Sequence, residues 1–313
     1  MTEILTITFN PAIDKSTTVP QLIPEKKLKC SQPHFEPGGG GINVARVINR
    51  LGGAVAAIYP SGGHPGNFFN DLLLEEKIMI KPCLIRDNTR ENMVIHDLHA
   101  DTQYRFGMPG PTLSEEEWRS CIHAIQEFKQ VRYIVVSGSL PSGIPFSVFN
   151  ELKMIADSLH ANLVIDTSGE ALMHAASCGA FLLKPNLGEL AMLTGKDKIQ
   201  ENEIPAIGRE LIFKKAAKML LVSMGEQGAI LITDQHAWRA IPPTLPRKST
   251  VGAGDSMVAG FIYALSTGKT PESALAYAVA AGTATTQHPG TQLCGAGDPE
   301  KLLPSVCLSE VKC

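Results

Sequence analysis

Several features that define common classes of protein are absent from this sequence of 313 residues. No apolar run approaches the roughly 18 residues that a membrane-spanning helix needs. The first nine residues have neither the basic segment nor the long apolar core of an export signal. Basic residues are not in excess, because the formal net charge is −3, and this argues against wholesale binding of nucleic acid. We therefore expect a cytoplasmic protein with neither a membrane nor a nucleic acid as its partner.

Patterned cysteines, internal repeats and long linkers are also lacking. The seven cysteines are scattered, and no two of them form a C-x-x-C pair. An odd number of unpatterned cysteines without an export signal is typical of reduced thiols in the cytosol. Because no low-complexity segment or linker divides the chain, residues 1–313 are expected to form one large domain.

Short apolar runs alternate with longer amphipathic segments along most of the chain. The short runs predict β-strands at residues 4–9, 55–59, 133–136, 163–165, 181–183, 219–222 and 229–232. The amphipathic segments predict helices at residues 42–51, 67–76, 114–128, 147–159, 188–193, 207–214, 256–265 and 273–285. This alternation predicts an α/β fold, in which a mostly parallel sheet is flanked by helices on both faces.

Two segments depart from this alternation, at about residues 15–37 and 90–108. Both carry polar–apolar alternation and no helical period, so each is predicted to form a β-hairpin or strand pair outside the main sheet. The two pairs together could form a small β-sheet over one end of the main sheet.

The most informative motif is the glycine-rich turn at residues 249–256, which reads Ser-Thr-Val-Gly-Ala-Gly-Asp-Ser and runs directly into a helix. A turn of small residues at a helix start leaves several backbone N–H groups free to hold an anion, such as a phosphoryl group in transfer. Asp255 has two interpretations. It could cap the helix, which is the better reading of the motif taken alone, or it could accept a proton from an attacking hydroxyl.

A second glycine-rich stretch, residues 37–46, also opens an amphipathic helix. The glycines Gly38 to Gly41 favour close approach of a ligand to the backbone, and Asn43 could both donate to and accept from sugar hydroxyls. Asp14 follows the first strand, at the edge of the sheet where parallel α/β proteins bind ligands. Taken alone, the segment is better explained as an ordinary Asn-Pro turn with a solvated Asp14.

Three further loops follow predicted strands. The first contains Lys184, Asn186 and Glu189, which could meet nucleotide phosphates and Mg²⁺ but also suit a charged surface junction. The loops at residues 137–143 and 223–228 could be ligand loops or simple turns. Together, five strand ends of one sheet carry small or polar residues suited to a phosphorylated ligand.

In the order and spacing of these segments the chain resembles the ribokinase/PfkB family of sugar kinases and, within it, the bacterial minor 6-phosphofructokinases. The resemblance covers essentially the whole chain, and residues 35–46 and 249–255 are its most specific segments. It implies a Rossmann-like α/β domain with a small β-sheet lid formed by the two insertions. It also implies a homodimer joined through the two lids.

The resemblance further implies roles for single residues. Asp255 would be the catalytic base, and the N–H groups of Gly252, Ala253 and Gly254 would form the anion hole. Sugar binding would fall to Asp14, Gly38, Gly39, Gly40, Gly41, Asn43 and Ser139. The site for Mg-ATP would comprise Lys184, Asn186, Ser223, Gly225 and Gly228, with Glu189 organising Mg²⁺. A potassium site, present in many relatives, would involve Ser249, Val251, Thr285, His288, Gly290 and Gln292.

The expected substrate rests on basic residues of the two insertions. Arg90, Arg105 and Lys27 could hold a terminal phosphate, as basic residues at these places do in the similar kinases. We therefore expect ATP-dependent phosphorylation of fructose 6-phosphate at its 1-hydroxyl. Tagatose 6-phosphate, fructose 1-phosphate and a non-catalytic sugar-phosphate sensor remain alternatives. Inhibition by ATP at a second site is known for the similar kinases, but His288 and Gln292 depart from their pattern, which leaves inhibition and potassium dependence open.

Overall fold

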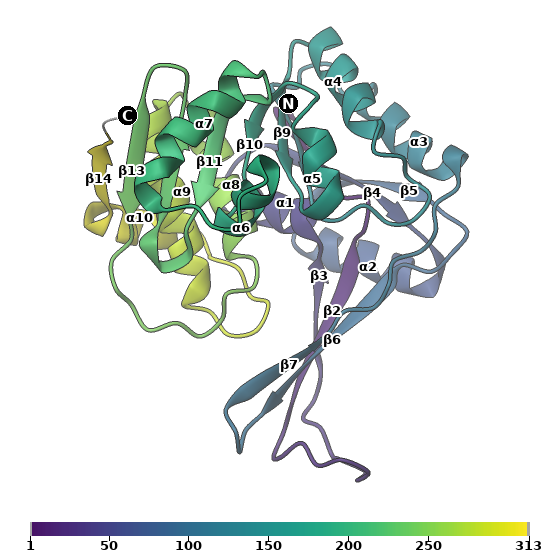
Figure 1. Cartoon of the computed structure of the whole chain (residues 1–313). Coiled ribbons are helices and arrows are strands. Elements are labelled where there is room, and N and C mark those ends of the chain that lie inside the picture. The colour runs from purple at the N-terminus through teal and green to yellow at the C-terminus, as the bar shows by residue number, and fades with distance from the viewer. Residues whose placement is uncertain (1, 312–313) are drawn as a thin grey trace.

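The computed structural model of the chain describes residues 2–311. A large sheet covered by helices forms the body of the molecule, and a small sheet projects from one end of it (Figure 1). Both chain ends lie at the opposite end of the body (Figure 1). Because the N-terminus leads directly into the first parallel strand, that strand runs toward the small sheet. The small sheet therefore extends from the edge at which the parallel strands finish.

The large sheet has ten strands within the described residues. The buried run Ile4–Ile7 forms β1, the third strand from the β5 edge, which pairs in parallel with β4 and β8. In spatial order the strands are β14 (Cys307–Glu310), β13 (Ala237–Ile241), β12 (Ala229–Ile232), β11 (Ala217–Ser223), β10 (Ala180–Leu183), β9 (Asn162–Asp166), β8 (Tyr133–Ser137), β1, β4 (Val55–Ser61) and β5 (Met79–Leu84). The strands from β11 to β5 are parallel, whereas β12, β13 and β14 extend one edge in antiparallel pairs.

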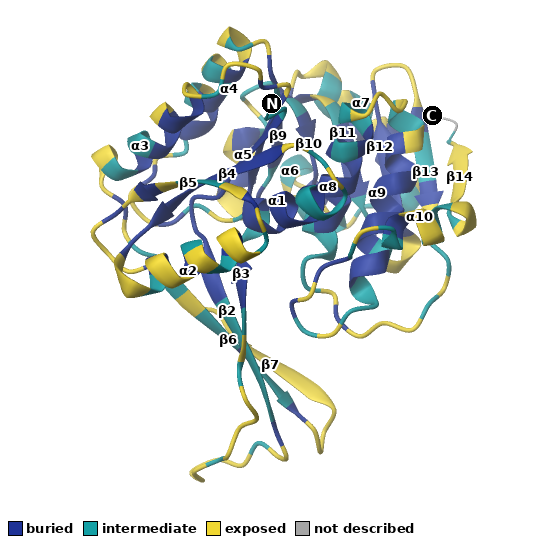
Figure 2. Ribbon diagram, turned by 180° about the vertical axis from the view of Figure 1, so that it is seen from behind, coloured by how far each residue is buried: buried dark blue, intermediate teal, exposed yellow. Residues whose placement is uncertain are grey.

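Helices cover both faces of this sheet, as the fully buried strands β1, β4 and β8 require. Each face has its own apolar core, and Figure 2 shows the buried strands between the two layers. One core includes residues of α3 (Glu115–Ile125), α4 (Val148–Ser158), α5 (Gly169–Ala175), α6 (Leu187–Thr194) and α7 (Ile204–Phe213). The other includes residues of α1 (Gly40–Arg50), α2 (Gly63–Glu75), α8 (Ala253–Ser266) and α9 (Pro271–Thr286), and α10 (Asp298–Leu302) packs against it.

The small sheet consists of four strands from the two inserted segments. Its order is β3 (His34–Gly38), β2 (Ala12–Val19), β6 (Arg90–Asp97) and β7 (Thr102–Phe106). Each segment contributes one antiparallel pair, and the pairs are joined by parallel pairing of β2 with β6. β2 and β3 are buried where they leave the body, and β7 is exposed along its whole length (Figure 2). At the far end of the sheet Val19 of β2 and Asp97 of β6 are buried.

The predicted fold class is confirmed, and so is each predicted strand and helix, within a few residues at its ends. Ser114 and Glu117 form a capping box at the start of α3. Five elements, β5, β13, β14, α5 and α10, were not predicted from the sequence. None of the described helices is long and apolar enough to span a membrane. The six described cysteines are free thiols, and Cys313 lies outside the described residues.

Candidate active site

The turn before α8 has the geometry that the motif requires. Gly252 is the N-cap residue and adopts a left-handed conformation, with φ 72°, which favours glycine. Asp255 stands in the first turn of α8, and the cap makes no side-chain hydrogen bond. The reading of Asp255 as the N-cap is therefore wrong. Its carboxyl is left free to take part in other interactions.

Residues from three distant segments surround the Asp255 carboxyl. Asn43 donates its Nδ2 to Oδ2 of Asp255 at 2.9 Å, and the Ser137 hydroxyl donates to Oδ1 at 3.5 Å. Burial and the nearby Asp166 carboxylate raise the pKa of Asp255 to about 6, although Asn43, Lys184 and Ser137 act in the opposite direction. A carboxylate with a pKa near neutrality is suited to accept a proton from a hydroxyl.

Lys184 brings a buried positive charge to the same place. Its Nζ lies 3.1 Å from Oδ1 of Asp166, and the residue is only 6% exposed. Burial lowers the pKa of Lys184, but the charges of Asp166, Glu189 and Asp255 outweigh it and the pKa is raised. A Cβ built on Gly254 would lie 3.7 Å from this Nζ. The ammonium therefore stands beside the backbone N–H groups of the turn.

A cavity of about 350 Å³ adjoins the turn. Its walls include three of the residues predicted to bind the nucleotide, together with two from the turn, namely Ser223, Gly225, Gly228, Ala253 and Gly254. The other two predicted nucleotide residues are adjacent in space. Asn186 forms a β-bridge with Ser223, and Lys184 stands at the turn.

Glu189 caps the helix that follows Lys184. Its Oε2 accepts from the backbone N–H of Asn186 at 2.8 Å, and the Asn186 side chain accepts from the N–H of Glu189 at 2.9 Å. One carboxylate oxygen is thereby committed to the cap. The other can hold water of a hydrated Mg²⁺ ion, which keeps several of its waters in proteins.

The glycines at the start of α1 are tightly enclosed. A Cβ on Gly38 would lie 2.1 Å from Oδ2 of Asp14, and one on Gly40 would lie 2.3 Å from the Ser137 hydroxyl. Gly39 is the N-cap of α1 with φ 113°, a conformation open to glycine. A Cβ on Gly41 would likewise clash with the Thr8 hydroxyl. The helix start thus lies against Asp14 on one side and Ser137 on the other.

Asp14, on β2, and Asn10, just after β1, lie beside the start of α1. Asn92 donates to Oδ1 of Asp14 at 2.9 Å, and Asn10 donates to the exposed Ser139 hydroxyl at 3.0 Å. Burial raises the pKa of Asp14, against the hydrogen bond from Asn92. The Oδ1 of Asn10 and the hydroxyl of Thr8 are buried without a hydrogen-bond partner. Unpaired buried polar atoms at such a place indicate a polar ligand.

The three basic residues of the insertions lie in different environments. Arg90 is half-buried and donates to the carbonyl oxygens of Asn10 and Met108, each at 3.0 Å. Arg105 is exposed on β7, where it pairs with Val94 of β6. The strand register puts it on the same sheet face as Asp14 and Arg90, further along β6 than Arg90. Lys27 lies in the exposed loop between β2 and β3, so the structure places it away from Asp14 and Arg90.

The two segments predicted to hold potassium lie against each other. The Ser249 hydroxyl donates to the carbonyl oxygen of Gly290 at 2.6 Å. The Thr285 hydroxyl is committed to Ser256, at 2.7 Å, and the His288 ring contacts Asp298 at 3.2 Å. A monovalent cation would therefore rely on main-chain oxygens of the two segments, which hard cations favour. Val251 and Gln292 belong to the same two segments.

Two residues of the site were not predicted, namely Asp166 at the end of β9 and Asn92 on β6. Ser137, at the end of β8, was included only in a loop that could equally be a simple turn. The signal for Asp166 and Ser137 was available, because both are polar residues that follow the apolar run of a parallel strand. No comparable signal exists for Asn92, whose partner Asp14 is 78 residues away.

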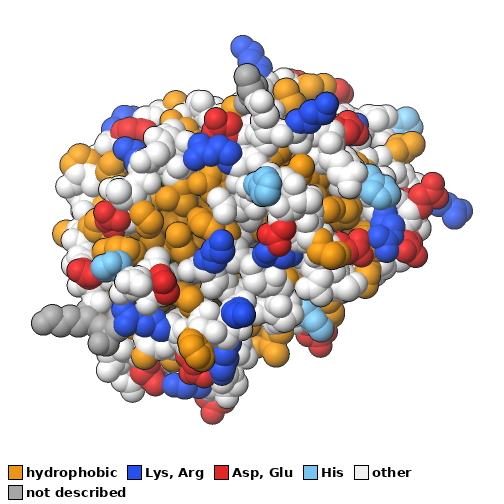
Figure 3. Space-filling model, turned by 90° about the horizontal axis from the view of Figure 1, so that it is seen from above, with side chains coloured by type: hydrophobic (Ala, Val, Ile, Leu, Met, Phe, Trp, Pro, Cys, Tyr) orange, Lys and Arg blue, Asp and Glu red, His pale blue; other side chains and the backbone are white. Residues whose placement is uncertain are grey.

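A second cavity lies at the other end of the sheet. It is lined by residues near the starts of β10 and β11 and by the turn between β12 and β13. The face seen in Figure 3 shows hydrophobic side chains gathered in a hollow among charged ones. The predicted catalytic residues all lie at the opposite end of the strands, so this cavity is separate from the candidate site.

Comparison with known proteins gives a consistent family. The model for the pfkB family of carbohydrate kinases matches residues 7–296. The chain is 39% identical to the ATP-dependent 6-phosphofructokinase isozyme 2 of Escherichia coli, over 96% of this chain and 98% of that protein. It is 31% identical to the 1-phosphofructokinase of Bacillus subtilis, over 90% and 92% of the two chains.

The solved structures that resemble the chain include several of E. coli phosphofructokinase-2. Its complex with fructose-6-phosphate matches with a TM-score of 0.91 at 37% identity, and its complex with potassium with 0.93 at 38%. Both matches cover 97% of this chain and 99% of that chain. A further structure of the same enzyme is a tetrameric inhibited form.

Proposed function

The chain belongs to the pfkB family of carbohydrate kinases, and we propose that it transfers the γ-phosphoryl group of ATP to the 1-hydroxyl of fructose 6-phosphate. The observation that carries this proposal is the position of Asp255. Its carboxyl, with a pKa near 6, lies between the polar residues around Asp14 and the cavity at the turn. A sugar hydroxyl and a nucleotide phosphate could meet at that point.

The proposed mechanism follows from these positions. Asp255 accepts the proton of the 1-hydroxyl while Asn43 and Ser137 hold its two oxygens in place. The N–H groups of Gly252, Ala253 and Gly254 and the Lys184 ammonium stabilise charge on the phosphoryl group in transfer. Glu189 would hold a hydrated Mg²⁺ ion through its second carboxylate oxygen, and the bound ion would neutralise part of the phosphate charge. The proposed cation site at residues 249–251 and 285–292 would steady the turn.

The proposed substrate side is the face of the small sheet that carries Asp14. Asp14, Gly38–Gly41, Asn43 and Ser139 would contact sugar hydroxyls, and Arg90 and Arg105 would meet the 6-phosphate. The small sheet, with its insertions at 15–37 and 90–108, would act as a lid on the single domain of residues 1–313. The E. coli relative was solved with fructose-6-phosphate, which supports this choice of sugar.

We also propose that two chains associate through the small sheet. Alternate residues of β6 and β7 place Met93, Ile95, Tyr104 and Phe106 on one face, away from Asp14. Tyr104 is 41% and Phe106 44% exposed, which is typical of an apolar face that a partner covers. Lys27, in the exposed loop of the same sheet, would then lie near the partner chain.

A coupled assay of ADP release tests the proposed function. Fructose 6-phosphate, tagatose 6-phosphate, fructose 1-phosphate and fructose are compared with and without potassium, and phosphorus NMR identifies the hydroxyl that is phosphorylated. We expect the highest kcat/KM with fructose 6-phosphate and phosphorylation at the 1-position. Activity confined to unphosphorylated sugars would contradict a sugar-phosphate substrate. Binding of sugar phosphate without any turnover would indicate a sensor.

A further inference from the structure

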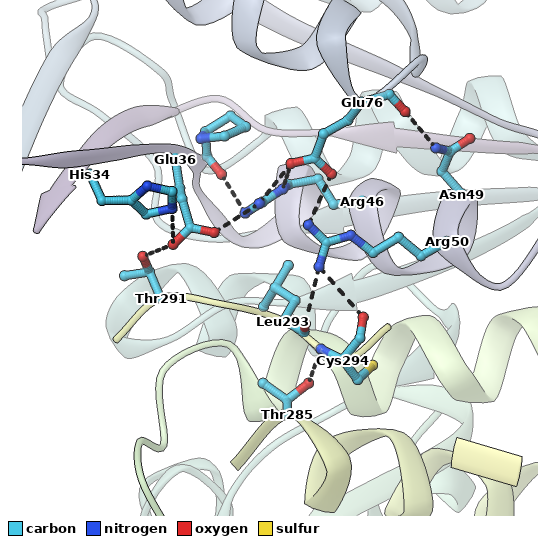
Figure 4. Close-up of polar contacts among 11 residues, drawn as sticks. His34, Glu36, Arg46, Asn49, Arg50, Glu76, Thr285, Thr291, Leu293 and Cys294 are labelled. Carbon is cyan, nitrogen blue, oxygen red and sulfur yellow. Dashed lines mark hydrogen bonds and ion pairs between the residues drawn. The ribbon is translucent and has the colours of Figure 1, made fainter. Parts of the chain in front are cut away.

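One face of α1 connects the proposed base to a partly buried cluster of charges. Asn43, Arg46 and Arg50 follow one another at spacings of three and four residues, so they lie along the same side of the helix. Asn43 reaches the Asp255 carboxyl. Arg46 and Arg50 belong to the charged cluster, which contacts none of the proposed reacting groups directly (Figure 4). The function proposed above assigns this cluster no role.

The cluster contains two arginines and two carboxylates. Arg46 is 2% exposed and donates to Glu36 at 3.1 Å and to Glu76 at 2.7 Å. Arg50 donates from Nη2 to the second carboxylate oxygen of Glu76, Oε2, at 3.1 Å. The charges therefore balance, and Glu76 ties the two arginines together. Such paired and hydrogen-bonded buried charges fix one geometry, because each remaining donor must find an acceptor.

The other terminal nitrogen of Arg50 connects the cluster to the turn before α8 through Leu293. This nitrogen, Nη1, donates to the carbonyl oxygen of Leu293 at 3.0 Å. The Leu293 side chain is 3% exposed and lies against Gly252, so that a Cβ on this glycine would be 2.4 Å from Cδ2 of Leu293. Arg50 thus holds the residue that supports the anion-hole turn from behind.

The same segment is held at a second point from the small sheet. The Thr291 hydroxyl donates to Oε2 of Glu36. Glu36 pairs with Asp14 across the β2–β3 ladder, so the strand that carries the proposed sugar ligand also anchors this segment. Figure 4 shows Arg46 and Glu36 reaching toward Thr291 on one side, and Arg50 toward Leu293 on the other.

We propose that Arg50, braced by Glu76 and Arg46, is a positioning residue for phosphoryl transfer, which sets the Gly252–Gly254 turn through Leu293. This inference rests on the proposed function of the turn as an anion hole. It predicts a specific kinetic signature. Displacement of the turn lowers kcat, whereas the sugar contacts around Asp14 are unaffected and KM for the sugar phosphate stays constant.

The test compares Arg50→Met with Arg132→Met. Arg132 is a matched control, because it also joins a carboxylate, Glu3, to a main-chain oxygen, that of Ser266 at the far end of α8. We expect Arg50→Met to lower kcat between about tenfold and a hundredfold, as a small misplacement of catalytic groups does. KM for the sugar phosphate should change less than about twofold, and Arg132→Met should leave both constants near the wild-type values.

Two further variants separate positioning from stability. Arg50→Lys, which can still reach the Leu293 carbonyl, should recover part of the lost kcat. Thr291→Val replaces Arg50→Met if that variant fails to fold, and should lower kcat in the same direction by less. Urea midpoints are measured for all variants. An unchanged kcat in both Arg50→Met and Thr291→Val, or a raised KM at constant kcat, would overturn the proposal.

Failure of the proposed function is distinguishable from failure of this inference. The wild-type protein is first assayed on the sugar panel described above, and the variants are compared on whichever sugar it phosphorylates. If the wild type phosphorylates another sugar, the substrate assignment fails, but the ratio of variant to wild-type kcat still decides the role of Arg50.

Discussion

The turn before α8 and the small sheet would both hold phosphate groups, yet they are built differently. At the turn, backbone N–H groups and the buried Lys184 ammonium are fixed by the helix start and by the surrounding core. On the small sheet, Arg90 is half-buried and Arg105 is exposed, and both depend on flexible side chains. The first arrangement suits a charge that appears only in the transition state, and the second suits a phosphate that stays unchanged.

The comparison indicates where chemistry and specificity reside in this fold. Changes at the turn should alter kcat, because in the proposed mechanism its groups would meet the phosphoryl group in transfer. Changes on the small sheet should alter KM, because its groups would contact the substrate equally in the ground and transition states. The following predictions test this division, beginning with the largest expected effect.

Replacement of Asp255 by asparagine should remove most turnover. The variant keeps an oxygen that can accept the hydrogen bond from Asn43, but it has no group that can take up the substrate proton. We therefore expect kcat to fall between about a hundredfold and about ten-thousandfold. Binding of ATP, measured by calorimetry, should persist. Turnover near the wild-type value would show that Asp255 is not the base.

Stability provides the control for this variant. The pKa of Asp255 is raised from 3.8 to about 6 on folding, so the folded state holds its proton more tightly than the unfolded state. The wild type therefore loses stability as pH rises from about 4 through about 6. Asp255→Asn removes this loss, and its urea midpoint at pH 7 should equal or exceed that of the wild type. A clearly lower midpoint would attribute the lost activity to misfolding.

Replacement of Arg90 by alanine should act mainly on KM. Loss of charged hydrogen bonds to a phosphate corresponds to an increase of about tenfold to a hundredfold in KM for fructose 6-phosphate. The kcat at saturating sugar should change much less. Because Arg90 also donates to carbonyl oxygens of Asn10 and Met108, Arg90→Lys serves as the control, retaining the charge without the fork. An unchanged KM in both variants would remove Arg90 from the site.

The pH profile should show the Asp255 carboxyl directly. With a pKa of about 6 in the free protein, the ionised base falls to roughly one tenth at pH 5, so kcat/KM should fall about tenfold between pH 7 and pH 5. The substrate phosphate also titrates near pH 6. Asp166→Asn separates the two, because the Asp166 charge raises the pKa of Asp255 and its removal should shift the profile to lower pH. A profile that does not move would assign the titration elsewhere.

The difference between the two regions also explains what the sequence could predict. The turn was recognisable because its function depends on adjacent residues, from Gly252 to Asp255, at a helix start. The parallel sheet followed from alternation of buried runs with amphipathic helices. Asp166 was overlooked although it ends a strand. The cluster of Arg46, Glu36 and Glu76 had no local signature, since its partners come from β3, the end of α2 and the segment after α9.

The smallest expected effect concerns the outer face of the small sheet. Phe106→Asp places a charge on the apolar face of Ile95, Tyr104 and Phe106, which should prevent two chains from pairing there. Sedimentation at micromolar concentration should show a dimer for the wild type and a monomer for the variant. Leu84→Asp, at an 85% exposed position on β5, is the matched control and should stay dimeric. Because the turn lies within one chain, kcat should change least of all. A monomeric wild type would exclude pairing through this face.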